Sequence, residues 1–355
     1  MKNVQNIADR AVDFLKELIS IRSYSGEEDQ TADLIFDLLK SEGFNPQRSK
    51  NNVWAWAGPK DENKPVVLLN SHHDTVKASS KWTKDPFTPT VEDGKLYGLG
   101  SNDAGGPLVS LLFTFLRLAK EPQPYNLLFL ASAEEETSGI QGVPIVLPLI
   151  GPVDFAIVGE PTSMRLAVAE RGLIVLDCIA QGKNGHAARN EGINAIYGAI
   201  KDIEWFRNFS FEKISDQLGE ITMSVTMVEA GSQHNVVPDE CRFVVDVRPN
   251  ELYTNEEVVE IIRQHVDCIV EPRSLHLNAS GISGDHPILT KAEKLNLQTF
   301  ASKTMSDQAH MPFPSVKIGP GDTHRSHTSD EYIFLDEIKE GIGIYINLLD
   351  DLRLG

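Results

Sequence analysis

The sequence has few cysteines, few basic residues and no long hydrophobic run, and each shortage excludes a class of protein. The three cysteines, Cys178, Cys241 and Cys268, lack paired spacing, so neither a disulfide framework nor a cysteine-based zinc site is supported. Lysine and arginine number 33 against 51 aspartates and glutamates, and the net charge of -18 argues against a nucleic-acid surface. The most apolar stretch, residues 142–153, is broken by prolines and is too short to span a bilayer.

The composition is otherwise typical of a globular protein. The 355 residues are 41% hydrophobic and 24% charged, enough for one large domain or two medium ones. Residues 1–19 carry apolar side chains at helical spacing among charged ones, so we expect an amphipathic helix and no signal peptide there. We therefore expect a cytoplasmic protein with no membrane partner.

Short apolar runs alternate with helical patterns in the first 160 residues and again near the C-terminus. Four runs predict strands buried on both faces, as in a parallel sheet: 66–69, 127–130, 155–158 and 315–318. Helical patterns lie between and after them, at 31–41, 108–120 and 335–352. We expect an α/β fold in which a parallel-rich sheet is sandwiched by helices, formed by residues 1–164 and 284–355.

The middle of the chain has a different pattern. Residues 165–283 predict strand, helix, strand, strand, helix, strand. The alternation of apolar and polar residues at 241–246 indicates an antiparallel sheet with one solvated face. We expect this βαββαβ segment to be an α+β domain inserted into the first one.

Ionisable side chains follow each of the four predicted strands. A single carboxylate in a loop is ordinarily a solvated charge. In open α/β sheets, however, ligands bind beyond the carboxyl ends of the strands, and all four of these loops are expected at that edge. The residues concerned are His72 and Asp74, Glu134 to Glu136, Glu160, and His324 and His327. A fifth candidate, Asp103, precedes a predicted helix. Its carboxylate either caps this helix or, because glycines flank the segment, points into the centre of the site.

Two histidines and several carboxylates, without cysteine, suit a pair of zinc, cobalt or manganese ions. A carboxylate that is not itself a ligand would then be free to take a proton from the attacking water. The sequence therefore predicts a two-metal hydrolytic centre at this edge of the sheet.

The ordered motifs resemble those of the co-catalytic zinc amidohydrolases, a family that includes acetylornithine deacetylase, succinyl-diaminopimelate desuccinylase and carboxypeptidase G. The resemblance spans the whole chain, and its motifs are His72-x-Asp74, Gly100-Ser101-Asn102-Asp103, Glu134-Glu135, Gly159-Glu160-Pro161-Thr162 and His327.

The resemblance implies two divalent metal ions per chain, most simply zinc, with Asp103 bridging them. The implied ligands are His72, Asp103 and Glu160 for one ion, and Asp103, Glu135 and His327 for the other. Asp74 is expected to orient the ring of His72, and Glu134 to act as the general base. The choice among the three consecutive glutamates rests on the resemblance alone.

The inserted domain contributes three further candidates by the same resemblance. His186 is expected to reach the active site of a partner subunit, which implies a homodimer through the inserted domain. Asn235 and Arg248 are expected to contact the substrate, with Arg248 gripping a carboxylate. The alternative for His186 is a surface or capping residue, and for Arg248 a salt bridge to Asp246 or Glu240.

Together these features predict a metal-dependent amidohydrolase that removes the acyl group of a small N-acyl amino acid. The leading case is N-acetyl- or N-succinyl-ornithine or citrulline in arginine biosynthesis. Alternatives are a succinyl-diaminopimelate desuccinylase, an N-acyl-lysine deacylase, and a dinuclear dipeptidase or carboxypeptidase. A non-catalytic binding protein on the same fold is the alternative from another class.

Overall fold

The computed structural model describes residues 2–189 and 191–354, which form two compact units. The larger unit comprises Met1–Val168, Ile282–Phe300 and Ser306–Gly355, and the inserted unit comprises Ala169–Gly281 and Ala301–Met305. The divisions expected after residues 164 and 283 lie near these boundaries. No sequence pattern indicated that Ala301–Met305 joins the inserted unit.

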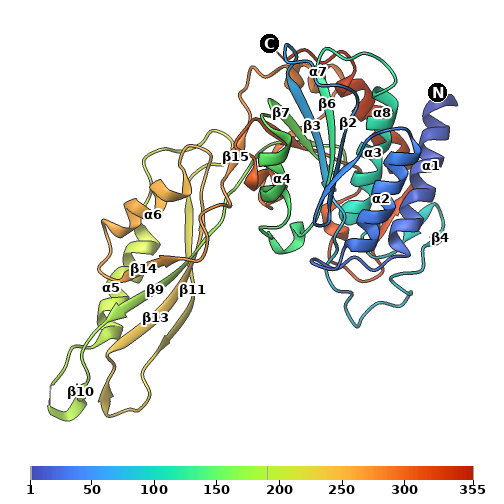
Figure 1. Ribbon diagram of the computed structural model, residues 1–355. Coiled ribbons are helices and arrows are strands. Elements are labelled where there is room, and N and C mark those ends of the chain that lie inside the picture. Colours follow the sequence, from blue (N-terminus) through green and yellow to red (C-terminus); the bar gives the residue numbers. More distant parts are fainter. Residues whose placement is uncertain (1, 190, 355) are drawn as a thin grey trace. The chain divides into compact units, whose positions relative to one another are not determined.

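A central sheet runs through the larger unit (Figure 1). Its strands lie in the order β1 (Gln47–Ser49), β2 (Asn52–Trp56), β6 (Asn126–Ser132), β3 (Val66–His72), β7 (Phe155–Val158) and β17 (Ser315–Lys317). The strands from β6 to β17 are parallel to one another, whereas β1 and β2 pair antiparallel at one edge. β8 (Leu166–Glu170) joins β17 by pairing Ala167 with Lys317, and the chain then enters the inserted unit.

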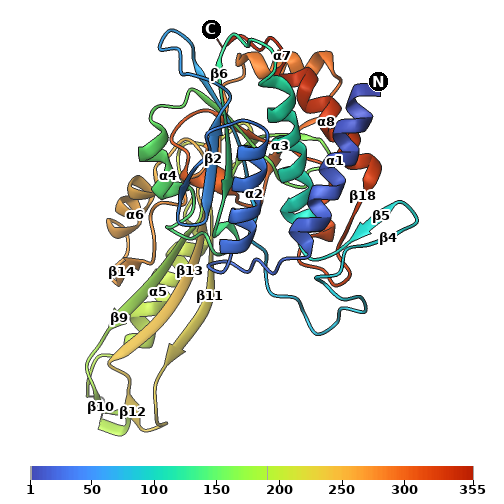
Figure 2. The same cartoon turned by 45° about the vertical axis from the view of Figure 1, so that its right-hand side comes forward.

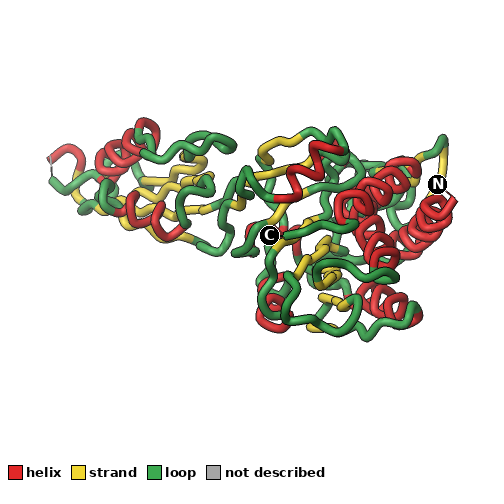
Figure 3. The backbone as a smooth tube through the Cα atoms, turned by 90° about the horizontal axis from the view of Figure 1, so that it is seen from above, coloured by secondary structure: helices red, strands yellow, loops and turns green. Residues whose placement is uncertain are grey.

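Helices cover both faces of this sheet. One face packs on α1 (Lys2–Ile19), α2 (Asp29–Ser41), α3 (Gly106–Leu118), α7 (Pro287–Lys294) and α8 (Leu335–Leu349). The other face packs on α4 (Val143–Ile150). Figure 2 shows α1, α2, α3 and α8 together on one side of the sheet, and Figure 3 shows most helical turns of this unit on one side of its strands. β3 and β6 are buried throughout, which confirms the parallel-rich sandwich.

A small antiparallel sheet lies beside the sandwich, with β5 (Lys95–Tyr97) between β4 (Thr90–Glu92) and β18 (Tyr332–Phe334). The pairing of β18 with β5 brings the residue before β18 to the segment after β5, because the Gly98 N–H donates to the backbone oxygen of Glu331 at 3.1 Å. This contact places Glu331 beside the chain that leads to Asp103.

The inserted unit has a four-stranded antiparallel sheet in the order β11 (Thr222–Ala230), β13 (Glu240–Arg248), β9 (Ile174–Gln181) and β14 (Ile269–Pro272). Two helices, α5 (Ala195–Asn208) and α6 (Asn255–Arg263), pack with alternate strand residues in one core. The chain order of these elements is the expected βαββαβ. Short pairings add β10 (Gly185–His186) to β12 (Val236–Val237), and β15 (Ser280–Gly281) and β16 (Thr299–Ser302) to β8.

None of the helices within residues 2–189 and 191–354 combines the length and the apolar character that a bilayer crossing requires.

Candidate active site

The loops at the carboxyl edge of the central sheet bring the predicted ionisable residues together. His72 is the last residue of β3, Glu135 and Glu136 follow β6, and Glu160 follows β7. Asp103 lies in the helical turn Ser101–Gly105, immediately before α3. The strand ends therefore position the side chains as the sheet-edge rule predicts.

His72, Asp103 and Glu160 form the first group of metal-ligand type. The Nε2 atom of His72 lies 3.4 Å from Oδ1 of Asp103 and 3.7 Å from Oε1 of Glu160. Both His72 Nε2 and Glu160 Oε1 are buried without a hydrogen-bond partner among the described residues. Buried polar atoms are normally paired, so these two facing atoms fit a cation held between them.

Asp103, Glu136 and His327 form the second group. Nε2 of His327 lies 2.9 Å from Oε2 of Glu136 and 3.6 Å from Oδ2 of Asp103. Asp103 thus offers one carboxylate oxygen to each group, the arrangement of a bridging ligand. The other candidate histidine of this loop, His324, belongs to neither group.

The structure contradicts the expected assignment of the three consecutive glutamates by one residue. Glu136, and not Glu135, lies against His327, while Oε2 of Glu135 lies 4.0 Å from Nε2 of His72. Glu134, expected as the base, takes a left-handed backbone conformation with φ 59°. Its carboxylate lies near Gln141, at 3.3 Å from the backbone nitrogen and 3.4 Å from the side-chain amide. Of the three glutamates, Glu135 is therefore the one that lies beside His72 without belonging to either ligand group.

Asp74 fixes the backbone of the loop that carries Glu134, Glu135 and Glu136. Its carboxylate accepts the backbone N–H groups of Glu135 and Glu136, each at 3.1 Å, and the hydroxyl of Ser25 at 2.6 Å. Nδ1 of His72 lies 3.0 Å from the Asp74 backbone oxygen and 3.4 Å from its carboxylate. With a proton on Nδ1, the Nε2 lone pair faces the site, so Asp74 orients both His72 and the glutamate loop.

Burial and mutual repulsion set the protonation of the cluster. Burial alone would lower the pKa of His72, but the neighbouring carboxylates of Asp103, Asp74, Glu135 and Glu160 raise that pKa well above the ordinary value. Burial raises the pKa of both Glu135 and Glu160 well above the ordinary value, and repulsion from neighbouring carboxylates adds to this effect. The hydrogen bond with Glu136 raises the pKa of His327 to about 9. Such an excess of buried carboxylates suits a site that exchanges protons for divalent cations.

Glu331 holds the segment that carries Asp103, a contact that the sequence did not predict. This glutamate is 2% exposed. Its carboxylate accepts the backbone N–H groups of Gly100, Asn102 and Asp103 at 3.1, 2.8 and 2.9 Å. Burial, with the charge of Asp103, raises the pKa of Glu331 to about 8. Its position four residues after His327 is the one signal that the sequence offered.

Asp307 is a second buried carboxylate that the sequence analysis missed. Its Oδ2 accepts the hydroxyl of Ser132, the last residue of β6, at 2.5 Å. Burial raises the pKa of Asp307 to about 6. It therefore supports the strand end from which the glutamate loop departs, although nothing in its local sequence distinguishes it from a loop aspartate.

Comparison with known proteins identifies the family to which this site belongs. A profile of Peptidase family M20/M25/M40 matches residues 68–351, most of the chain and all the residues of the two groups. The chain belongs to peptidase family M20/M25/M40. It is accordingly a dinuclear metal amidohydrolase, and not a non-catalytic protein on the same fold.

Two curated relatives have related names. The succinyl-diaminopimelate desuccinylase of Buchnera aphidicola subsp. Cinara cedri is 30% identical over 70% of this chain and 70% of its own length. The acetylornithine deacetylase of Shigella sonnei is 29% identical over 91% of this chain and 92% of its own.

Solved structures share the fold at lower identity. The aminopeptidase PepT of Bacillus cereus has a TM-score of 0.78 at 18% identity, covering 97% of this chain and 98% of its own. A dinuclear metal binding peptidase of Bacillus subtilis has a TM-score of 0.74 at 17% identity, covering 97% and 98%. These two likenesses establish the M20 fold of this chain.

The candidates in the inserted unit of this M20 protein lie in two places. His186 and Asn235 are neighbours, because the N–H of Ala187 donates to the Asn235 backbone oxygen at 3.1 Å, and both side chains are exposed. Arg248 ends β13, whose nine residues span roughly 30 Å at about 3.3 Å per residue. It forms a two-point salt bridge with Asp246 at 2.7 and 2.9 Å, which was the alternative for this residue.

Proposed function

We propose that this protein hydrolyses the amide bond of an N-acyl amino acid, with N-acetyl- or N-succinyl-ornithine or citrulline as the leading substrates in arginine biosynthesis. The observation that carries the proposal is the convergence of two ligand groups on Asp103, with His72 Nε2 and Glu160 Oε1 buried and unpaired. The names of the relatives, a desuccinylase and a deacetylase, support an acyl amino acid as the substrate.

The proposed metal ligands are His72, Asp103 and Glu160 for one divalent ion, and Asp103, Glu136 and His327 for the other. We favour zinc, with cobalt and manganese as alternatives, because all three accept imidazole and carboxylate ligands. When bound, the pair would polarise the scissile carbonyl and lower the pKa of the attacking water.

Glu135 is the proposed general base. Its carboxylate lies beside His72 but is in neither ligand group, so it remains available to take a proton from the attacking water. The same carboxyl group then delivers that proton to the amine nitrogen as the amide bond breaks. His186, Asn235 and Arg248 remain our candidates for contacts with the substrate, and the Asp246 salt bridge would have to open before Arg248 could bind a carboxylate.

The inserted unit also supports the proposal of a homodimer. β11 is an edge strand, and it exposes Met227 and Val228 at 64% and 59%. α5 exposes Tyr197 at 72% and Ile200 at 47%. An unpaired edge strand with apolar side chains favours pairing with a second copy of the same surface.

A substrate screen tests the proposed function. Purified protein would be incubated with N-acetyl and N-succinyl derivatives of ornithine, citrulline, lysine and diaminopimelate, and with dipeptides, while the release of free amine is measured. We expect the highest kcat/KM with an acyl ornithine or citrulline, and loss of turnover after chelation with recovery on adding zinc. Preferential cleavage of dipeptides would reject the deacylase assignment and favour the dipeptidase alternative.

A further inference from the structure

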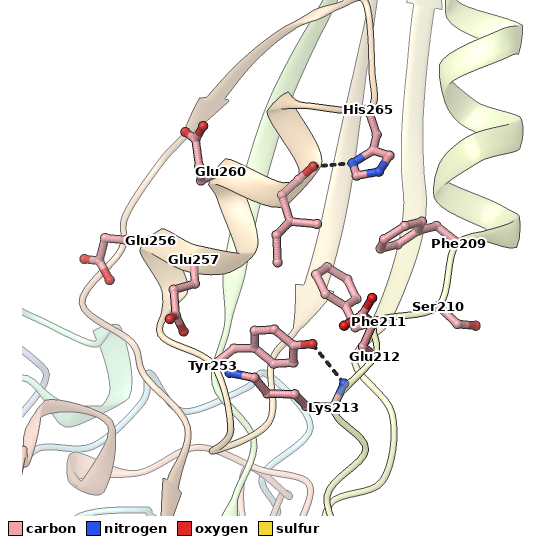
Figure 4. Close-up of a pocket in the computed structure, with 11 residues that line it drawn as sticks. Phe209, Ser210, Phe211, Glu212, Lys213, Tyr253, Glu256, Glu257, Glu260 and His265 are labelled. Carbon is pink, nitrogen blue, oxygen red and sulfur yellow. Dashed lines mark hydrogen bonds between the residues drawn. The ribbon is translucent and has the colours of Figure 1, made fainter.

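The inserted unit contains a cavity of about 830 Å³ beside α6 and the segment that follows α5 (Figure 4). We call it the aromatic cavity, because Phe209, Phe211, Tyr253 and His265 line it. Its volume is within the range of small-molecule sites. All its lining residues belong to the inserted unit, so it is separate from the two ligand groups of the larger unit.

The rings of the cavity hold one another in place. Trp205 stacks on Phe209 with 4.4 Å between ring centroids, and on His265 with 5.4 Å. Phe211 meets Tyr253 edge to face at 5.5 Å. Because these contacts fix the rings without a ligand, the aromatic walls are formed in advance.

The cavity is strongly acidic as well as aromatic. Its lining includes four glutamates, at 212, 256, 257 and 260, and one lysine, at 213, so its formal charge is -4 + 1 = -3. Capping of α6 accounts for Glu257, whose carboxylate accepts the N–H of Thr254 at 2.9 Å. Helix capping does not account for Glu212, because this residue lies on the segment that follows α5. A carboxylate ligand would be repelled by this lining, and a cation would be attracted.

The cavity already holds one cation of its own chain. The ammonium of Lys213 lies 4.6 Å from the centroid of the Tyr253 ring and donates to the Leu252 backbone oxygen at 3.2 Å. Figure 4 shows the Lys213 backbone nitrogen bonded to the Tyr253 hydroxyl, at 2.9 Å. Figure 4 also shows the bond of His265 Nδ1 to the Ile261 oxygen, at 2.7 Å, which leaves Nε2 of a neutral ring as an acceptor.

We propose that the aromatic cavity binds a small organic cation, an ammonium or guanidinium group carried on an apolar stem without a carboxylate. The rings of Phe209 and Phe211 receive the apolar stem, and the glutamates balance the charge of the cation, while Lys213 covers the Tyr253 ring. The absence of a carboxylate distinguishes this ligand from the amino acids that the catalytic unit is proposed to handle. The cavity and the proposed hydrolysis are independent of each other.

Three probes of one shape and different charge test the proposal by isothermal titration calorimetry on the full-length protein. They are 2-phenylethylamine, 2-phenylethanol and 3-phenylpropionate, which are cationic, neutral and anionic at pH 7. We expect saturable binding of the amine, at least tenfold tighter than the alcohol, and no binding of the acid. Equal binding of amine and alcohol, or no binding of the amine at millimolar concentration, would overturn the proposal.

Matched variants locate the binding. Replacing Glu212, Glu256 and Glu260 together by glutamine should weaken amine binding at least tenfold. Replacing Glu229 by glutamine, on β11 and outside the cavity, should leave it unchanged. Glu212, Glu256, Glu260 and the control residue Glu229 are all exposed, so these variants are expected to fold. Unchanged amine binding in the triple variant would place the amine elsewhere and reject the cavity as its site.

Discussion

The two units differ in how they hold their functional side chains. In the larger unit the metal-ligand candidates other than His327 are at most partly exposed, with His72 1% exposed, and the loops that carry them are held by backbone hydrogen bonds to Asp74 and Glu331. In the inserted unit His186 and Asn235 lie exposed near a two-residue strand pairing. Metal ligands need fixed geometry before the ion arrives, whereas residues that meet a substrate or a partner must remain accessible. Substitutions in the larger unit should therefore affect metal binding or chemistry, and those in the inserted unit should spare the metals.

The largest effect is expected from Glu135→Gln. It should lower kcat by about a thousandfold, because general acid–base catalysis contributes 10²–10⁴-fold, while both metals stay bound. Turnover and metal content of the purified variant would be measured together. Glu134→Gln is the matched control, and it should retain activity within a few fold, because Glu134 lies near Gln141. Full activity of Glu135→Gln with loss of activity in Glu134→Gln would restore the assignment made from sequence.

The next effect is expected from His186→Ala in the inserted unit. It should lower kcat by about a hundredfold, the scale of a lost hydrogen bond to the reacting carbonyl oxygen of the substrate, without changing metal content or the unfolding temperature. Steady-state kinetics and metal analysis would check this expectation.

A mixing experiment then tests the proposed dimer. Combining His186→Ala chains with Glu135→Gln chains should restore activity, because one site of each mixed dimer would have both residues intact. If His186 acts within its own chain, or if the chain is a monomer, the mixture would stay inactive.

A smaller effect is expected from Glu331→Gln. The amide nitrogen would face backbone N–H groups that now donate to the carboxylate, so the segment bearing Asp103 would shift. Metal affinity, measured by competition with a chelator, should fall by about 10–100-fold, as for other groups that orient ligands. Glu340→Gln, an exposed change on α8, is the control. Unaltered affinity in Glu331→Gln would mean that other contacts hold Asp103.

The smallest effect is expected from Asp307→Asn, seen as a pH-dependent stability of the metal-free protein. The pKa of Asp307 is raised from 3.8 to about 6, so its ionisation costs folding free energy as the pH rises through that window. The variant should gain a few degrees of unfolding temperature at pH 8 and nothing at pH 3.5. A gain of equal size at both pH values would assign the effect to packing instead of charge.

The strand pattern predicted the larger unit well, because a parallel sheet covered on both faces requires continuous apolar strands. Runs such as 66–69 and 127–130 identified β3 and β6, and the sheet-edge rule then collected His72, Glu136 and Glu160 at one place, whereas Asp103 comes from the turn before α3. The alternation at 241–246 likewise identified β13. Short pairings such as β10 with β12 were missed, because two residues carry no periodicity.

The sequence by itself determined the fold class, the family and the types of side chain at the active site, because these depend on periodicity and on residues at fixed order along the chain. Only the tertiary structure decided where each of the three glutamates lies. Glu134, Glu135 and Glu136 are chemically identical and adjacent, so no pattern distinguishes them. Asp74, distant in sequence, accepts the N–H groups of the last two and thereby turns Glu136 toward His327. The position of Glu331 was likewise not predictable from the sequence, because its carboxylate accepts N–H groups of residues more than 200 positions away, which only the fold brings to it.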